Sequence, residues 1–247
     1  MPLVRNEGYD SCMSTCAIAL LAALFIQGPG KVEIKDTLTG IGIAAQPGDI
    51  ITVNYTGKLA SGKQFDSSVD RAPFQFTLGA GQVIKGWDQG LVGMKVHGIR
   101  SLTIPSDLAY GAQSAGEIPP NSDLKFDITM VKIDRIKTKI LTEGKGELTA
   151  LGGDVCELHY ELKDDTGKVL DSSYERKQTF QIILGRTALI KGFTAGVIGM
   201  KQGEKRELTI LAEFGYGDKG VGEGLIKPGQ TLFFTIEMVK LARGETK

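Results

Sequence analysis

Residues 81–90 read GQVIKGWDQG and contain Trp87, which is the only tryptophan of the 247-residue chain. The same frame returns at residues 187–196 as TALIKGFTAG, with Phe193 in the position of the tryptophan. The two aromatic residues lie 106 positions apart. A motif that recurs once at such a distance indicates that the chain repeats a whole domain, because solenoid repeats are only 20–50 residues long.

Residue pairs on both sides of this motif keep the same spacing. Tyr55 recurs as Tyr160 and Asp66 as Asp171, each 105 positions later. The offset then grows slowly, and only in loops, through the pairs Phe74 and Phe180, Gly79 and Gly185, Met94 and Met200, Tyr110 and Tyr216, and Phe126 and Phe234. The sequence therefore predicts an N-terminal extension over residues 1–30, a first domain over 31–134 and a second domain over 139–243, with a short linker near residues 134–138.

Within the first domain, alternating apolar and polar residues predict extended strands. These segments are DIITVNYTGKL (49–59), QFDSS (64–68), PFQFTLG (73–79), HGIRSLTIP (97–105) and SDLKFDITMVKI (122–133). One stretch, residues 83–94, is typical of a helix, because Val83, Trp87 and Leu91 are spaced i, i+4, i+8 and form one apolar face. Strands with turn signals and a single short helix predict an α+β fold with an antiparallel sheet packed on that helix.

Composition excludes several classes of site. The formal net charge of zero argues against a nucleic-acid partner, which would require a basic surface. Three cysteines, Cys12, Cys16 and Cys156, cannot form a disulfide framework. The two histidines, His97 and His159, have no metal-ligand spacing to each other or to the cysteines. We therefore expect no metal and no cofactor.

The N-terminal extension contains eleven consecutive apolar residues at positions 16–26. This length suits the apolar region of a signal peptide and is too short for a confident membrane span. The flanks fit less well, since Arg5 is the only basic residue before the run and no clear cleavage site follows it. We expect export or membrane anchoring through this segment, and a soluble helix in a cytoplasmic protein is the alternative.

The residues alone leave the chemistry open. Ser67 and Ser68 have no general base nearby in the sequence, and a single carboxylate beside two serines is often a turn former. Six aromatic residues of the first domain lie on different predicted elements that the fold would bring together: Tyr55, Phe65, Phe74, Trp87, Tyr110 and Phe126. They could form an ordinary core, or they could line a concave apolar pocket.

The motifs YTG, FDSS, DR, PFQFTLG, VIKGW, YG and IPPN occur in this order along the first domain. In their order and spacing they closely resemble an FKBP-type peptidyl-prolyl cis-trans isomerase domain. The resemblance covers roughly residues 31–134, and residues 139–242 resemble a second, divergent copy. It implies two tandem FKBP-like domains, each with a half-wrapped five-stranded antiparallel β-sheet packed on a short α-helix.

The resemblance also implies a proline pocket in the first domain. Trp87 would form its floor, Val83 and Ile84 its rim, and the backbone N–H of Ile84 would bind a substrate carbonyl. The remaining implied residues are the walls Tyr55, Phe65, Phe74 and Phe126, the hydroxyl donor Tyr110, the cap Ile118, and the edge acceptor Asp66 with its partner Arg71. Gln82 stands where the family often has glutamate, and the loop after Tyr110 is one residue shorter than the commonest form.

The second domain keeps part of this set. Its implied pocket residues are Tyr160, Asp171, Phe180, Ile190, Phe193, Tyr216, Ile226 and Phe234, with Arg176 beside Asp171. Two walls differ, since Phe193 replaces the tryptophan and Leu170 replaces the phenylalanine of FDSS. We expect weak turnover or binding alone in this copy.

The resemblance implies a monomeric enzyme that accelerates rotation about X–Pro bonds of folding proteins without a covalent intermediate. Its partners would be proline-containing polypeptides and macrolides such as tacrolimus or rapamycin. The alternative is a chaperone or scaffold that binds proline segments with little turnover. Without the resemblance, a sheet protein that binds an apolar small molecule remains a third interpretation.

Overall fold

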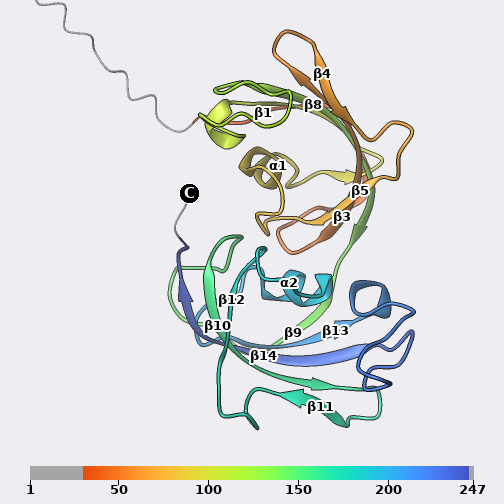
Figure 1. Ribbon diagram of the computed structural model, residues 1–247, viewed down its shortest axis with the longest axis vertical. Coiled ribbons are helices and arrows are strands. Elements are labelled where there is room, and N and C mark those ends of the chain that lie inside the picture. The colour runs from red at the N-terminus through yellow and green to blue at the C-terminus, as the bar shows by residue number, and fades with distance from the viewer. Residues whose placement is uncertain (1–29, 245–247) are drawn as a thin grey trace, which may run out of the picture.

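The computed structural model describes residues 30–244, which form two large curved sheets, each with a short helix on its inner face, and one separate two-stranded sheet (Figure 1). The first sheet system comprises β1 (Glu33–Leu38), β2 (Ile41–Ala44), β3 (Ile50–Leu59), β4 (Gln64–Ser67), β5 (Phe74–Thr77), α1 (Lys85–Gly90), β6 (Lys95–Val96), β7 (Ile99–Ile104), the 3-10 turn η1 (Ser106–Leu108) and β8 (Leu124–Asp134). The second comprises β9 (Lys137–Thr142), β10 (Val155–Lys163), β11 (Val169–Ser172), β12 (Phe180–Ile183), α2 (Lys191–Val197), β13 (Lys205–Ile210), η2 (Ala212–Phe214) and β14 (Leu232–Ala242).

The first sheet is antiparallel throughout, in the order β1-β7-β8-β3-β4, with β5 also paired to β3. β4 and β5 occupy the same edge because they pair with different ends of β3. β5 pairs with Ile50–Val53, and β4 pairs with Thr56–Lys58. The sheet is thus five strands wide, and the segment between Ser67 and Phe74 interrupts its outer edge.

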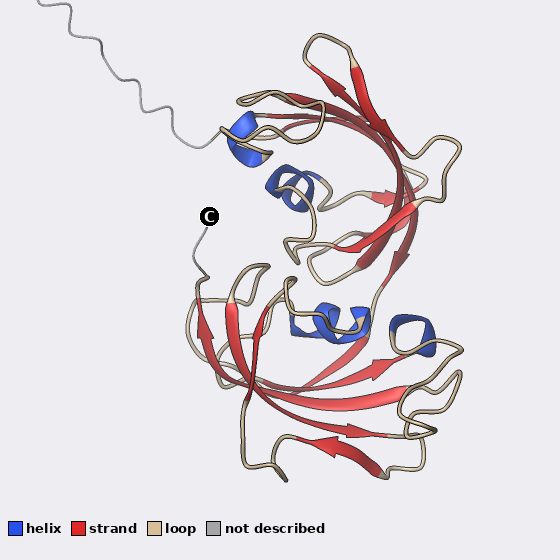
Figure 2. Ribbon diagram, viewed as in Figure 1, coloured by secondary structure: helices blue, strands red, loops and turns tan. Residues whose placement is uncertain are grey.

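The second sheet repeats this plan in the order β11-β10-β14-β13-β9, with β12 paired to β10. Figure 2 shows that the strands of both sheets curve around short helices. β9 takes the place of β1, and β10 takes the place of β3. The predicted α+β class and the two sheet-on-helix units are confirmed. The hydrophobic core of each unit lies between its sheet and its helix, where Leu102 and Ile104 of the first correspond to Leu208 and Ile210 of the second.

Helix α1 is shorter than the sequence pattern predicts. It spans Lys85–Gly90, so Val83 precedes it and Leu91 caps it. The backbone at Ile84 is still extended, and Gly93 has a positive φ of 81° that ends the segment. Trp87 and Leu91 are nevertheless buried, as the i, i+4 spacing requires.

Two glycines allow each helix to approach its sheet closely. A Cβ at Gly86 would overlap the side chain of Ile104, and a Cβ at Gly90 would lie 2.7 Å from Leu102 Cδ1. In the second unit, Gly192 and Gly196 meet Ile210 and Leu208 in the same way. Glycine disfavours a helix by about 0.5–1 kcal/mol relative to alanine, so packing rather than helix propensity holds these helices in place.

The two units are joined by a short connection and also pack against each other. The backbone N–H of Gly152 donates to the carbonyl of Gly79 at 2.9 Å. Ile50 and Ala80 of the first unit are fully buried and belong to the hydrophobic cluster of the second. The second core therefore includes side chains from the first unit.

The apolar run at residues 16–26 lies outside the described residues. Within residues 30–244, no helix is long and apolar enough to cross a membrane.

Candidate active site

The aromatic residues of the first unit converge because four strands, helix α1 and the loop after η1 present them to one concave surface. Tyr55 comes from β3, Phe65 from β4 and Phe126 from β8. A Cβ at Gly57 would lie 2.8 Å from both the Phe65 and the Phe126 ring, so a glycine is required there for the two rings to meet. Their centroids are 5.7 Å apart at an interplanar angle of 87°.

Trp87 lies at the bottom of this surface and is only 4% exposed. Its ring is nearly perpendicular to Tyr55 at a centroid distance of 5.1 Å and to Phe126 at 5.2 Å. Phe76, which the sequence analysis does not single out, packs behind it at 5.8 Å. Edge-to-face contacts of this kind stabilise aromatic clusters by about 0.5–1.5 kcal/mol per pair beyond burial. The floor of the recess is therefore rigidly supported.

Above Trp87 lies an open recess of about 210 Å³. It is lined by Tyr55, Phe65, Asp66, Phe74, Gln82, Val83, Ile84, Trp87, Tyr110 and Phe126. Arg71 pairs with Asp66, as the resemblance implies, and does not itself line the recess. Ile118 is not part of this lining; it is buried in the core, and its backbone forms a β-bridge with Ala115.

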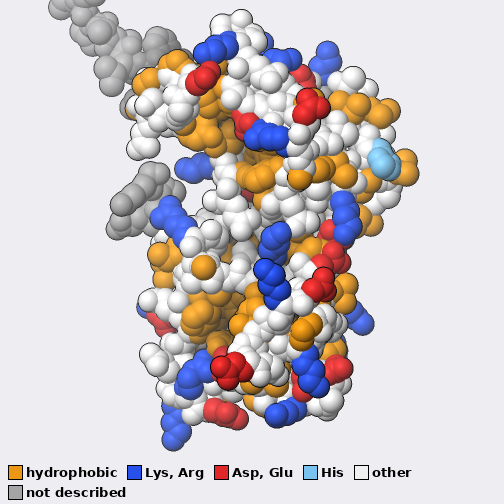
Figure 3. Space-filling view, turned by 45° about the vertical axis from the view of Figure 1, so that its right-hand side comes forward, with side chains coloured by type: hydrophobic (Ala, Val, Ile, Leu, Met, Phe, Trp, Pro, Cys, Tyr) orange, Lys and Arg blue, Asp and Glu red, His pale blue; other side chains and the backbone are white. Residues whose placement is uncertain are grey.

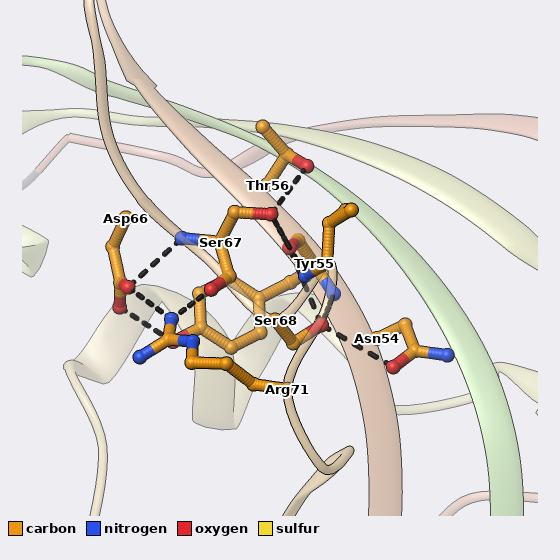
Figure 4. Close-up of polar contacts among 8 residues, drawn as sticks. Asn54, Tyr55, Thr56, Asp66, Ser67, Ser68 and Arg71 are labelled. Atoms are coloured by element: carbon orange, nitrogen blue, oxygen red, sulfur yellow. Dashed lines mark hydrogen bonds and ion pairs between the residues drawn. The ribbon is translucent and has the colours of Figure 1, made fainter.

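The polar edge of the recess is built around Asp66 (Figure 4). The Tyr55 hydroxyl donates to Asp66 Oδ2 at 2.5 Å, Arg71 Nη2 donates to Oδ1 at 2.5 Å, and the Ser67 backbone N–H donates to Oδ1 at 2.8 Å. Ser68 Oγ accepts from the Tyr55 backbone N–H at 2.8 Å and fixes the strand next to it.

These hydrogen bonds also set the charge of the edge. Partial burial opposes ionisation of Asp66, but the donors Tyr55 and Arg71 outweigh it and lower the pKa of the carboxyl group below its usual value. Burial, together with the neighbouring Asp66, raises the pKa of the Tyr55 hydroxyl. At neutral pH the recess therefore has an ionised carboxylate and a neutral tyrosine at its edge.

Backbone and side-chain donors near the floor remain available. In the part of the chain that the structure describes, the backbone N–H of Ile84 donates no hydrogen bond, and the buried Trp87 Nε1 has no partner. The Gln82 side chain is already engaged, since its Oε1 accepts from the Thr77 backbone N–H at 2.9 Å. The backbone N–H of Ile84, on the rim, is therefore free to donate to a ligand.

The residue after the tryptophan has a separate role. Asp88 accepts hydrogen bonds from the backbone N–H groups of Gly79 at 2.8 Å and Gly81 at 3.0 Å. Burial raises the pKa of Asp88 to about 6, although these two donors oppose the shift. Asp88 thus ties helix α1 to the loop that contacts the second unit. A single carboxylate in a helix gives no sequence signal for such a role, whereas Phe76 could have been found from its position two residues after Phe74.

Comparison with known proteins identifies the family. The family model described as FKBP-type peptidyl-prolyl cis-trans isomerase matches residues 42–131 and again residues 146–239. The chain belongs to this family. It thus contains two FKBP-type domains, in agreement with the two sheet systems described above.

The chain is similar to several named proteins. "Peptidyl-prolyl cis-trans isomerase FKBP9" of Rattus norvegicus is 38% identical over 202 residues, which cover 78% of this chain and 35% of the relative. "FK506-binding protein" of Neisseria meningitidis serogroup A is 52% identical over 106 residues, which cover 42% of this chain and 97% of the relative. The crystal structure of the three FKBP domains of wheat FKBP73 aligns with 86% of the chain at 22% identity and a TM-score of 0.42. The chain spans about a third of the length of the rat relative.

The second FKBP-type domain has a wider recess of about 570 Å³. It is lined by Tyr160, Leu162, Asp171, Phe180, Ala188, Leu189, Ile190, Lys191, Phe193, Glu213, Phe214, Gly215, Tyr216 and Phe234. Phe193 is smaller than its counterpart Trp87, and Leu170, the counterpart of Phe65, packs on the core and does not line the recess. Ile226, expected in the pocket, is buried in the core and does not line it.

The polar edge of the second recess repeats that of the first. The Tyr160 hydroxyl donates to Asp171 Oδ2 at 2.5 Å, and Arg176 pairs with Asp171. Arg176 Nη2 also donates to the Tyr160 hydroxyl at 2.7 Å. Burial again opposes ionisation, and the donors Tyr160 and Arg176 again lower the pKa of Asp171. The two recesses therefore have the same kind of polar edge but different floors, which are Trp87 in the first and Phe193 in the second.

Proposed function

We propose that the recess of the first FKBP-type domain catalyses cis–trans isomerisation of X–Pro bonds in polypeptide substrates. The observation that supports this most strongly is the ring-lined space of about 210 Å³ above Trp87. Pockets for drug-sized ligands usually measure about 300–1,000 Å³, so this recess suits one small apolar ring with its adjoining imide. A prolyl residue has that shape.

The reaction requires no nucleophile. Rotation about a peptide bond costs about 18–20 kcal/mol because the twisted bond loses resonance. The planar imide is the more dipolar form, so aromatic walls that exclude water disfavour it relative to the twisted form. A site that binds the twisted imide better than the planar one lowers the barrier by that difference. Each tenfold acceleration requires only about 1.4 kcal/mol of this difference.

The chain's own groups can orient the substrate during rotation. The unpaired backbone N–H of Ile84 can hold a substrate carbonyl at the rim, while the Tyr110 hydroxyl offers a second donor at the opening. The proline ring would rest on Trp87, so the segment preceding proline can turn while the ring stays fixed. We also propose that macrolides such as tacrolimus compete for this recess, as the name of the Neisseria relative suggests for that protein.

The two domains supply a matched test in the full chain. The double variant Trp87→Phe with Phe65→Leu gives the first recess the floor and wall of the second. We expect kcat/KM in a protease-coupled prolyl peptide assay to fall at least tenfold, a loss of about 1.4 kcal/mol of transition-state stabilisation. Both replacements are accommodated in the same frame of the second domain, so the fold should persist, which circular dichroism would verify.

The reciprocal variant, Leu170→Phe with Phe193→Trp, is the control. It changes the same two positions of the second recess and should leave turnover at the first recess intact. An undiminished kcat/KM after the Trp87→Phe and Phe65→Leu exchange would refute the proposal.

A second candidate function is the capture of proline-containing segments without turnover. The wider second recess favours it, because an intact polar edge above a smaller floor residue can bind a prolyl segment but holds its imide less tightly. Capture by the second domain and turnover by the first are compatible in one chain.

A further inference from the structure

The rim of the second recess lies against the first domain. Lys191 at the start of α2, and Glu213 and Phe214 in η2, all line this recess. In Figure 1, α2 lies on the side of its sheet that faces the first domain. Two separate parts of the rim therefore border the neighbouring domain.

Side chains of the first domain contact both parts of this rim. Lys191 Nζ donates to Gln75 Oε1 on β5 at 2.5 Å. Lys132 Nζ on β8 lies 3.7 Å from Glu213 Oε2 and 5.9 Å from the centroid of the Phe214 ring. Figure 3 shows lysine and arginine side chains among the hydrophobic ones where the two domains meet.

The first recess has no matching arrangement. Its counterpart of Glu213 is Asp107, which accepts from the backbone N–H of Gly30 at 2.7 Å, within its own domain. Its counterpart of Phe214 is Leu108, which does not line the first recess. The contact between a rim and a neighbouring domain is thus specific to the second recess.

The domain contact is close enough to fix this geometry. The loop of Gly79, Ala80 and Gly81 packs on Gly152 so tightly that a Cβ at Gly152 would overlap the backbone of Ala80 and Gly81. Ala80 is fully buried in the second domain's cluster. An exposed ion pair such as Lys132 with Glu213 stabilises little by itself, so the packed loop must supply the rigidity that positions the rim.

We infer that the second recess is a binding site for proline-containing polypeptide segments, whose rim is held in its binding geometry by the docked first domain. All the residues that line it belong to the second domain, and Gln75 and Lys132 of the first domain contact the rim residues Lys191, Glu213 and Phe214 from outside the recess. Binding to a preorganised rim avoids the entropic cost of ordering the exposed side chains of Lys191 and Glu213 on association. The inference rests on the proposed function only in taking proline as the ligand.

The test is a titration of the isotope-labelled full chain with a blocked tetrapeptide that contains a Leu-Pro bond. The backbone amide signals of Ile190 and Tyr216 report on the second recess, and the indole signal of Trp87 reports on the first. Gly152→Ala should separate the domains. We expect this variant to raise the Kd at the second recess about tenfold and the Kd at the first recess less than twofold.

Gly153→Ala is the matched control. A Cβ at Gly153 meets open space, and its positive φ of 90° brings backbone strain without an interdomain clash. It should change neither Kd. Small-angle scattering and the amide signals of Gly79 and Gly81 report whether the domains remain docked in each variant.

Each outcome decides the inference. Undocked domains with an unchanged Kd at the second recess would overturn it. If the domains of Gly152→Ala stay docked, the double variant Gln75→Ala with Lys132→Ala removes the rim contacts directly. This variant should raise the Kd of the peptide at the second recess about threefold. An unchanged Kd would overturn the inference. Absence of peptide binding at the second recess of the wild type would also overturn the inference. Failure of the proposed isomerase function is a separate result, because it would appear as absent turnover in the prolyl peptide assay.

Discussion

The polar edge is the feature that the two recesses share residue by residue. Tyr55 and Tyr160 each donate to a carboxylate at 2.5 Å, and each carboxylate also pairs with an arginine five positions further on. Burial favours protonation of both carboxylates, and the donors reverse that preference. The repeat in the sequence predicts this edge, because all three residue types recur at constant spacing.

Asp88 differs from these carboxylates, since burial raises its pKa to about 6 from a model-peptide value of 3.8. The folded chain therefore holds this proton more tightly than the unfolded chain. Between about pH 4 and pH 6 the folded state binds more protons, so the contribution of Asp88 to the free energy of unfolding falls as the pH rises. The loss is at most about 3 kcal/mol, at 1.36 kcal/mol per pKa unit, and is complete above about pH 7.

Urea unfolding of the wild type and of Asp88→Asn across pH 4–8 measures this contribution. The variant lacks the titrating group but keeps the other carboxylates, including Asp36 and Asp66, whose lowered pKa values act in the opposite direction below about pH 4. The wild-type free energy of unfolding minus that of the variant should decrease from pH 4 to pH 6 and stay constant above pH 7. A difference that rises with pH, or does not depend on it, would contradict the assignment.

At the scale of elements, helix α1 depends on residues that isolated helices disfavour. Gly86 and Gly90 face Ile104 and Leu102 on β7, with no room for a methyl group. Alanine at an exposed helix position would stabilise by about 0.5–1 kcal/mol. Here the added methyl group forces the helix away from the sheet, and overpacking of this kind costs about 1–3 kcal/mol.

Gly86→Ala and Gly90→Ala should therefore each lower the free energy of unfolding, as measured by urea titration. Gln89→Ala, an exposed change in the same helix, should leave it unchanged or raise it slightly. Because Trp87 lies between the two glycines, both glycine variants should also shift its fluorescence. Stabilisation by either glycine variant would show that the helix does not need its close approach to β7.

The sequence predicts the strands and the aromatic set well but places the loops and helix ends poorly. Period-two alternation locates β3, β5 and β8, since each presents one face to a core. The helix is overestimated because Val83 matches the apolar spacing while the backbone at Ile84 is still extended. Ile118 and Ile226 are buried in the cores beside the recesses because the loops that carry them fold inward, which no local pattern specifies.

At the scale of the whole molecule, the contact between the domains is the feature that the sequence does not reveal. Ile50 and Ala80 read as ordinary members of a strand and of a glycine-rich turn. Their burial in the second core depends on the partner surface around Gly152 and Gly185, more than 70 positions further along the chain. Tandem duplication predicts two similar units but not how they pack.

The shared core predicts that the two domains unfold together. Ile50 and Ala80 are fully buried in the second domain's cluster, so separating the domains exposes apolar surface of both. Calorimetry of the wild type should show one transition, with the calorimetric enthalpy equal to the van't Hoff enthalpy for the whole chain. Ala80→Glu places an unpaired charge in this contact and should split the transition into two, because a buried charge without a partner favours undocking.

Ala44→Glu, on the exposed strand β2, adds the same charge away from the contact and should keep a single transition. Two well-separated transitions in the wild type would mean that the contact contributes too little to couple the domains. Splitting in both variants alike would attribute the effect to added charge and not to the lost contact. The packed loop couples the domains if the wild type shows one transition, Ala80→Glu shows two and Ala44→Glu shows one. Rigid docking of this kind is also what the proposed binding geometry of the second recess requires.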